Sequence, residues 1–166
     1  MTDDQSIQSS ESRDLECMLL PLVNRTALLP AETVVELAPL KPFDMIHSTP
    51  DWFLGFYDWR GVRVPIVSLE TINEVGSPKI SVGGRVAIIQ NTGIDERIKY
   101  LSVITQPTPE GKNVFESDIE ENPNADKYKY DLMTVKIGSD PYVIPDIVAL
   151  EKAILSLNIL KDRYFD

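Results

Sequence analysis

The chain contains no recognisable arrangement of catalytic residues. Its single histidine, His47, stands between prolines in a polar stretch, where an exposed or half-buried histidine is the ordinary outcome. A Ser-His-Asp triad would need His47 as its base, yet no serine stands in a G-x-S-x-G turn. The single cysteine, Cys17, begins an apolar run, so we expect a small core hydrophobe and not a thiolate nucleophile.

Binding motifs for phosphates and metals are equally scarce. The pair Gly83-Gly84 belongs to neither a G-x-x-x-x-G-K-[ST] loop nor a G-x-G-x-x-G turn. The carboxylates Glu120 and Glu121 lie in a polar, acidic stretch, without the contrast of surroundings that separates a catalytic acid from a base. One cysteine also excludes an intrachain disulfide and a multi-cysteine zinc site. The sequence therefore predicts no enzymatic activity, no cofactor and no metal.

Residues 51–70 hold an unusual concentration of aromatic side chains, followed by an arginine at a predicted turn. Most of these aromatics are expected to fill a small core. Trp59 differs, because Arg60 follows it and Gly61 lets the backbone turn, which would leave a planar guanidinium at the rim. Trp and Arg are the side chains found most often at the energetic centres of protein interfaces. Trp59, Arg60 and Gly61 are therefore candidate protein-interaction residues.

The charge pattern argues against nucleic acid as a partner. The 166 residues include 26 Asp+Glu and 16 Lys+Arg, a net charge of -10 and a pI near 4.6. Residues 1–16 and 106–131 hold most of the excess, and we expect a disordered acidic tail and a solvated surface loop. Basic clusters that could neutralise phosphates are missing. The start of the chain has no signal-peptide pattern, so a cytoplasmic protein is expected.

The elements that must position the candidate residues are short β-strands. Apolar, β-branched runs alternate with turn residues throughout, and only the last segment has helical spacing, beginning at Asp146. The strands are expected at 17–23, 26–30, 33–37, 52–59, 62–70, 85–90, 99–105, 132–137 and 141–145. Gly55 inside the aromatic strand indicates a bulge or a close backbone approach. This pattern favours small β-barrels over a βαβ sheet.

The segment around Arg60 resembles the signature of the CheW-like adaptor domain of bacterial chemosensory systems. The matching residues are Gly55, Trp59, Arg60, Gly61, Pro65, Ile66, Val67 and Leu69. Ser68 stands where this family commonly has aspartate. Weaker similarity extends over about 17–157 and includes the strand Val34-Val35-Glu36-Leu37 and the closing segment after Asp146.

The resemblance implies a mainly β fold of two packed, SH3-like, five-stranded barrels with a C-terminal helix. We expect a first barrel at about 17–75, a second at about 80–145, and the helix at about 146–160. It also implies a non-catalytic adaptor that couples a chemoreceptor's cytoplasmic tip to the regulatory domain of a CheA-type histidine kinase, at membrane-associated receptor arrays. The biological output would be chemotaxis or, in a type IV pilus system, twitching motility.

The resemblance assigns the interaction residues to two surfaces. Arg60 and Gly61 would face the receptor, and Val34, Glu36 and Leu37 would form a partner surface on the first barrel. Two alternatives remain open from the residues alone. One is a small acidic enzyme or ligand-binding barrel that depends on His47. The other is an OB-like nucleic-acid binder that stacks bases on the aromatics at 52–59, although it would lack a positive groove.

Overall fold

The computed structural model describes residues 12–160, which form two β-sheets and two short α-helices. The elements of this range, in chain order, are β1 (Asp14–Pro21), β2 (Thr26–Pro30), η1 (Ala31–Thr33), β3 (Val34–Pro39), β4 (Phe53–Trp59), β5 (Val62–Val67), α2 (Leu69–Ile72), β6 (Arg85–Gln90), β7 (Tyr100–Thr105), β8 (Glu110–Phe115), η2 (Glu116–Asp118), β9 (Ile119–Glu121), β10 (Asp131–Ile137), β11 (Asp140–Pro145) and α3 (Ile147–Ser156).

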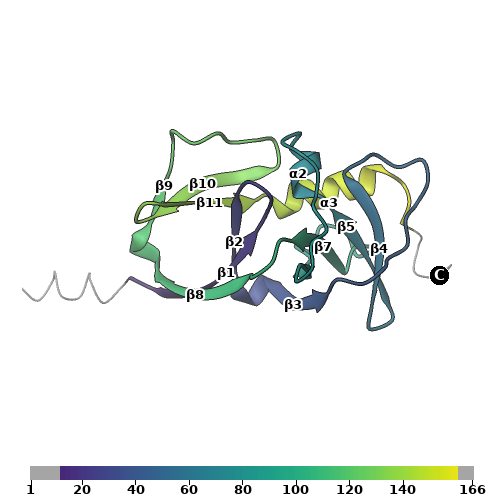
Figure 1. Cartoon of the computed structure of the whole chain (residues 1–166), viewed down its shortest axis with the longest axis horizontal. Helices are drawn as coiled ribbons and strands as arrows, with labels where there is room; N and C mark the ends of the chain where they lie inside the picture. The colour runs from purple at the N-terminus through teal and green to yellow at the C-terminus, as the bar shows by residue number, and fades with distance from the viewer. Residues whose placement is uncertain (1–11, 161–166) are drawn as a thin grey trace, which may run out of the picture.

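The two sheets lie side by side as separate lobes (Figure 1). The six-stranded sheet has the order β8-β1-β2-β11-β10-β9 and forms the left lobe, and the five-stranded sheet has the order β3-β6-β7-β5-β4 and forms the right lobe. The expected mainly β fold with a C-terminal helix is confirmed. The expectation of five strands in each barrel holds for one sheet, while the other has six.

The expected division of the chain at residues 75–80 is wrong. The N-terminal hairpin β1–β2 belongs with the C-terminal strands: Ala27 pairs with Val143 in parallel, and Asp14 pairs with Phe115 in antiparallel register. All strands from β3 to β7 form the other sheet, so the segment 76–84 is a loop within one lobe. The residues of the β1–β2 hairpin do not indicate which distant strands they will pair with. The boundary between the lobes therefore could not be predicted from them.

Both acidic stretches differ from their expected form. Of the predicted tail, residues 1–11 lie outside the described range, but Asp14, Leu15 and Glu16 already belong to β1. The predicted loop at 106–131 contains β8, η2 and β9. Val114 is the one buried residue of β8, so pairing with β1 holds this polar strand in place and burial contributes little.

The core consists of three clusters of buried apolar side chains. The largest draws on both sheets and on α3, and its buried members are Leu20, Leu22, Ala27, Leu29, Val67, Leu69, Ile72, Ala87, Ile89, Ile98, Leu101, Val103, Val143, Leu150 and Ile154. A second cluster fills the five-stranded sheet and includes Tyr57, Trp59 and Val64. A third fills the six-stranded sheet and includes Cys17 and Leu19. The large cluster therefore joins the two lobes hydrophobically.

Both helices begin at side-chain caps that the sequence specifies. The carboxylate of Asp146 accepts a hydrogen bond from the Ala149 N–H, as expected for the first residue before α3. Ser68 caps α2 by accepting from the Thr71 N–H. Serine and aspartate are both good N-cap residues. The replacement of the family's common aspartate by Ser68 therefore keeps the local structure.

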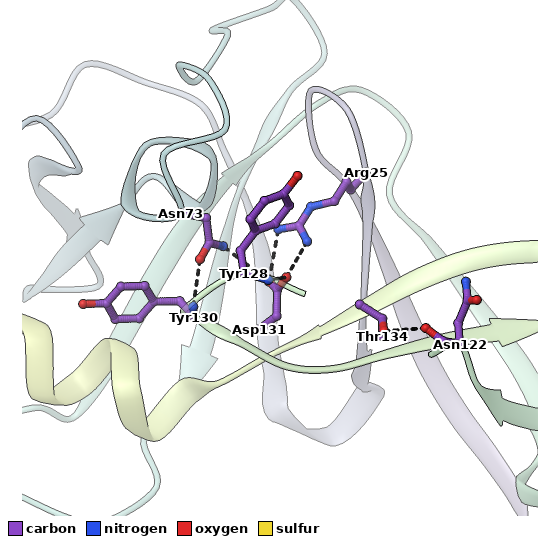
Figure 2. A network of polar contacts seen from close by, with 7 residues as sticks. All are labelled: Arg25, Asn73, Asn122, Tyr128, Tyr130, Asp131 and Thr134. Carbon is purple, nitrogen blue, oxygen red and sulfur yellow. Dashed lines mark hydrogen bonds and ion pairs between the residues drawn. The ribbon is translucent and has the colours of Figure 1, made fainter. Parts of the chain in front are cut away.

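A buried polar junction also connects the lobes (Figure 2). Arg25 follows the β1–β2 turn and makes two hydrogen bonds to the Asp131 carboxylate, of 2.6 and 3.1 Å. Asn73, at the end of α2, donates to the same carboxylate at 3.3 Å and accepts from the Tyr130 N–H at 2.8 Å. Tyr128 donates its backbone N–H to Asp131 at 2.8 Å. One carboxylate therefore holds three segments together.

Gly55 is required by a close backbone approach, as its position in the aromatic strand predicts. The β4–β5 register shifts between Phe53 and Gly55, and Gly55 has φ +138°. A Cβ at this position would lie 2.0 Å from the carbonyl oxygen of Asp44. Asp44 and Phe56 exchange backbone hydrogen bonds of 2.9 and 2.7 Å. The loop before β4 therefore covers the outer edge of that strand.

Candidate protein-interaction surface

Arg60 and Gly61 form the two-residue turn between β4 and β5. Trp59 pairs with Val62 across this turn, and the φ angles of Arg60 and Gly61 are 52° and 79°. Tight hairpin turns of the primed type need a positive φ at both central positions, which glycine adopts freely. The turn lies at the tip of the hairpin that extends beyond β3 in Figure 1. The sequence thus places a guanidinium at an exposed tip, as predicted.

Two contacts join the edge strands of the five-stranded sheet, β3 and β4. The Arg60 Nη2 donates to the Glu36 Oε1 at 2.6 Å, and the Tyr57 hydroxyl donates to the carbonyl oxygen of Pro39 at 2.6 Å. Because β3 and β4 are the two ends of the sheet order, these contacts close the sheet toward a barrel. We call the exposed part of this closure the seam surface and define it as Val35, Glu36, Arg60 and Gly61.

The ion pair of the seam surface is too exposed to contribute much stability. The side chains of Arg60 and Glu36 are 72% and 33% exposed. Exposed pairs of this kind contribute roughly 0–1 kcal/mol, because water and salt screen the charges. The guanidinium also lies over the Trp59 ring, with its central carbon 5.1 Å from the ring centre. The pair and the ring therefore orient Arg60 while its remaining donors face solvent.

The electrostatics beneath the surface are consistent with this arrangement. Burial raises the pKa of the Tyr57 hydroxyl above its ordinary value, and the negative charge of Glu36 raises it further. Tyr57 therefore stays protonated at neutral pH and keeps its hydrogen bond to Pro39. The Lys41 ammonium lies 4.8 Å from the centre of the Tyr57 ring.

The structure brings together residues that the resemblance assigned to two surfaces. Arg60 and Gly61, expected to face a receptor, lie directly beside Glu36, expected to face another partner. Val34 and Leu37 are half-buried and pack against the large core cluster, so they belong largely to the interior.

Two further residues of β3 and β4 differ from expectation: Trp59 is buried and Val35 is exposed. Trp59 is buried, and its ring meets Tyr100 edge to face at 4.9 Å between centroids. Its Nε1 has no hydrogen-bond partner within the described residues. Val35, which sequence reasoning missed, is exposed between Val34 and Glu36. Val35 lies at the register shift between Val34 and Glu36, so the simple alternation of a β-strand, which would place it on the same face as Leu37, does not find it.

The residues considered for catalysis, His47 and Cys17, are not part of the seam surface. His47 is exposed in the loop before β4. Cys17 is buried in the six-stranded sheet, and burial raises the pKa of its thiol, which disfavours a reactive thiolate. Within residues 12–160, no three His, Cys, Asp or Glu side chains are placed to hold a metal ion. No helix of this range has the length and apolar character needed to cross a bilayer.

Comparisons with known proteins agree with the geometry. The family model described as the CheW-like domain matches residues 16–127. The fold is similar to the crystal structure of the scaffolding protein TtCheW from Thermoanaerobacter tengcongensis, with a TM-score of 0.68 and 18% sequence identity over 80% of this chain and 89% of that chain. No curated protein matches the chain. The family match covers more than half of the sequence, so the chain belongs to the CheW-like domain family, the scaffolds and adaptors of chemotaxis signalling.

Proposed function

We propose that the chain is a non-catalytic adaptor that couples a chemoreceptor's cytoplasmic tip to the regulatory domain of a CheA-type histidine kinase. It would act at membrane-associated receptor arrays, in chemotaxis or in twitching motility. The observation that carries the proposal is the seam surface, where exposed Arg60 pairs with the Glu36 carboxylate and the neighbouring residue of β3, Val35, is exposed. Family membership supports the general role, because CheW-like proteins interact with chemoreceptors and with this kinase.

The seam surface offers a partner both an apolar side chain and hydrogen-bond donors. Val35 offers an apolar contact, and Arg60 offers several N–H donors in a fixed fork. An adaptor transmits a signal only if it contacts its partners differently in their active and inactive states. A weak, exposed ion pair suits this role, since Arg60 can exchange Glu36 for a partner carboxylate at little cost in stability.

Reversing the charges of the Arg60–Glu36 pair tests whether Arg60 binds the receptor or only pairs with Glu36. We expect Arg60→Glu to reduce binding of a purified receptor cytoplasmic fragment at least tenfold, about 1.4 kcal/mol, since the new carboxylate would repel the partner carboxylate that Arg60 binds. The double variant Glu36→Arg/Arg60→Glu rebuilds the internal pair in reverse. We expect it to bind as poorly as the single variant, with an unchanged circular dichroism spectrum. Isothermal titration calorimetry measures both affinities.

The matched control is Arg13→Glu, which changes another exposed arginine, just before β1, that pairs with Glu116 of η2. It should bind the receptor fragment as the unmodified chain does. If the double variant recovers full binding, the pair has only an internal role and the assignment of Arg60 to recognition is wrong. Equal loss in the control would show a non-specific effect of charge.

A further inference from the structure

A second surface of the five-stranded lobe has the form of a docking groove. It is an open groove with a volume of about 630 Å³, and its two walls come from segments far apart in sequence. Residues 39–43, from the last residue of β3 onward, form one wall, and residues 80–85, up to the first residue of β6, form the other. The groove does not include the seam residues Val35, Glu36, Arg60 or Gly61.

Hydrogen bonds fix the second wall without burying its apolar side chains. The Gln106 side chain donates to the carbonyl oxygen of Lys79 at 2.7 Å and accepts from the Ser81 hydroxyl at 3.2 Å. The Gly84 N–H donates to the Ser81 carbonyl at 2.9 Å, and a Cβ on Gly84 would lie 2.8 Å from the Thr105 carbonyl oxygen. The wall is therefore held in place before any partner arrives, which lowers the entropy cost of binding.

Two of the three most exposed large apolar side chains of the described range line this groove. Val82, Ile80 and Met45 are 102%, 62% and 76% exposed, more than any other large apolar residue of residues 12–160. Val82 and Ile80 line the groove, whereas Met45 is not among its lining residues. Exposed apolar residues are normally scattered singly over a protein surface. Adjacent ones on a hydrogen-bonded loop are typical of an interaction site.

The charge of the groove contrasts with that of the chain. Residues 38–43 and 76–85 include Lys41, Lys79 and Arg85 and no acid, although the whole chain has a net charge of -10. The Arg85 Nη1 donates to the carbonyl oxygens of Gly83 and Gly84, which holds its guanidinium at the groove. Complementary charge steers association and selects among partners.

We propose that this groove binds a short segment of a partner protein in which apolar side chains are flanked by aspartate or glutamate. The apolar side chains would fill the space between Phe43 and Val82, and the carboxylates would meet Lys41 and Arg85. The inference does not depend on the proposed function, because it stands on the shape, exposure and charge of the groove alone. It gives the chain a second docking surface on the same lobe as the seam surface.

A titration with synthetic peptides tests the proposal. The full-length chain, labelled with ¹⁵N, is titrated with a short peptide of leucine and glutamate, and with a counterpart in which every glutamate is lysine. We expect the acidic peptide to shift the amide signals of residues 80–85 and of Lys41, and the basic peptide to leave them in place. Shifts confined to other residues, equal shifts with both peptides, or no shifts would each overturn the proposal.

Two variants test the same surface from the protein side. Lys41→Glu/Arg85→Glu should weaken binding of the acidic peptide at least about tenfold, and Val82→Asp should do the same. Lys99→Glu/Lys112→Glu, two exposed lysines of other segments, is the matched control and should bind normally. Sedimentation velocity tests whether a second copy of the chain occupies the groove instead. If the chain self-associates and Val82→Asp abolishes this, the groove is an interface between copies and the proposal is wrong.

Discussion

Replacing Asp131 with alanine should lower the free energy of unfolding by about 3–5 kcal/mol, the range expected when one partner of a buried ion pair is removed. The Asp131 side chain is 2% exposed and accepts from Arg25, Asn73 and the Tyr128 N–H (Figure 2). Alanine leaves a guanidinium that is only 21% exposed without its counter-ion, together with two unsatisfied donors. Urea denaturation followed by tryptophan fluorescence measures the loss.

The exposed ion pair Arg13–Glu116 provides the matched comparison. Its side chains are 76% and 55% exposed, so Glu116→Ala should cost roughly 0–1 kcal/mol. Asp131→Asn, which keeps the shape but removes the charge, should fall between the two. If Asp131→Ala is as stable as Glu116→Ala, the junction does not hold the lobes together in the way we describe. If Asp131→Ala does not fold, the Asn variant still decides the matter.

Replacing Gly55 with alanine should cost about 3 kcal/mol, as the sum of two effects. At φ +138° a residue with a Cβ pays roughly 1–3 kcal/mol of backbone strain. The added Cβ would also meet the Asp44 carbonyl oxygen at 2.0 Å, and inserting a carbon into packed structure typically costs about 1–3 kcal/mol. To remove this clash, Asp44 would have to move away from β4 and break its hydrogen bonds with Phe56. Thermal denaturation measures the effect.

Gly61→Ala separates the clash from the strain. Gly61 also has a positive φ, of 79°, but no atom lies within 4 Å of its added Cβ. Gly61→Ala should therefore lower the free energy of unfolding only by the backbone strain, roughly 1–2 kcal/mol. Equal losses at the two positions would mean that the contact between Gly55 and Asp44 contributes nothing, contrary to the close approach seen in the structure.

The local features of the fold could be predicted from the sequence because their causes are local. The cap at Asp146, the turn at Arg60-Gly61 and the bulge at Gly55 each follow from a residue type at a defined position. The burial of Cys17 follows from its apolar neighbours. The family signature around Arg60 then supplied the fold, since its residues coincide with β4, the turn and β5.

Long-range features could not be predicted in this way. The pairing of Ala27 with Val143 depends on the whole topology, so the boundary between the lobes was misplaced. The ion pair between Glu36 and Arg60 joins the two ends of one sheet, and this proximity exists only once the sheet closes. The groove between residues 39–43 and residues 80–85 also brings two segments together that are distant in sequence. Neither wall has a distinctive motif, and its exposed apolar side chains are ordinary residues in sequence.

The central claim is that the chain works by binding two signalling proteins at once. Sedimentation velocity with the purified chain, a receptor cytoplasmic fragment and the regulatory domain of the CheA-type kinase from the same cells tests it directly. Our account predicts a complex that contains all three proteins and that is lost with Arg60→Glu, while receptor and kinase domain alone associate more weakly. A folded chain that binds neither protein at concentrations well above those in the cell would contradict the account.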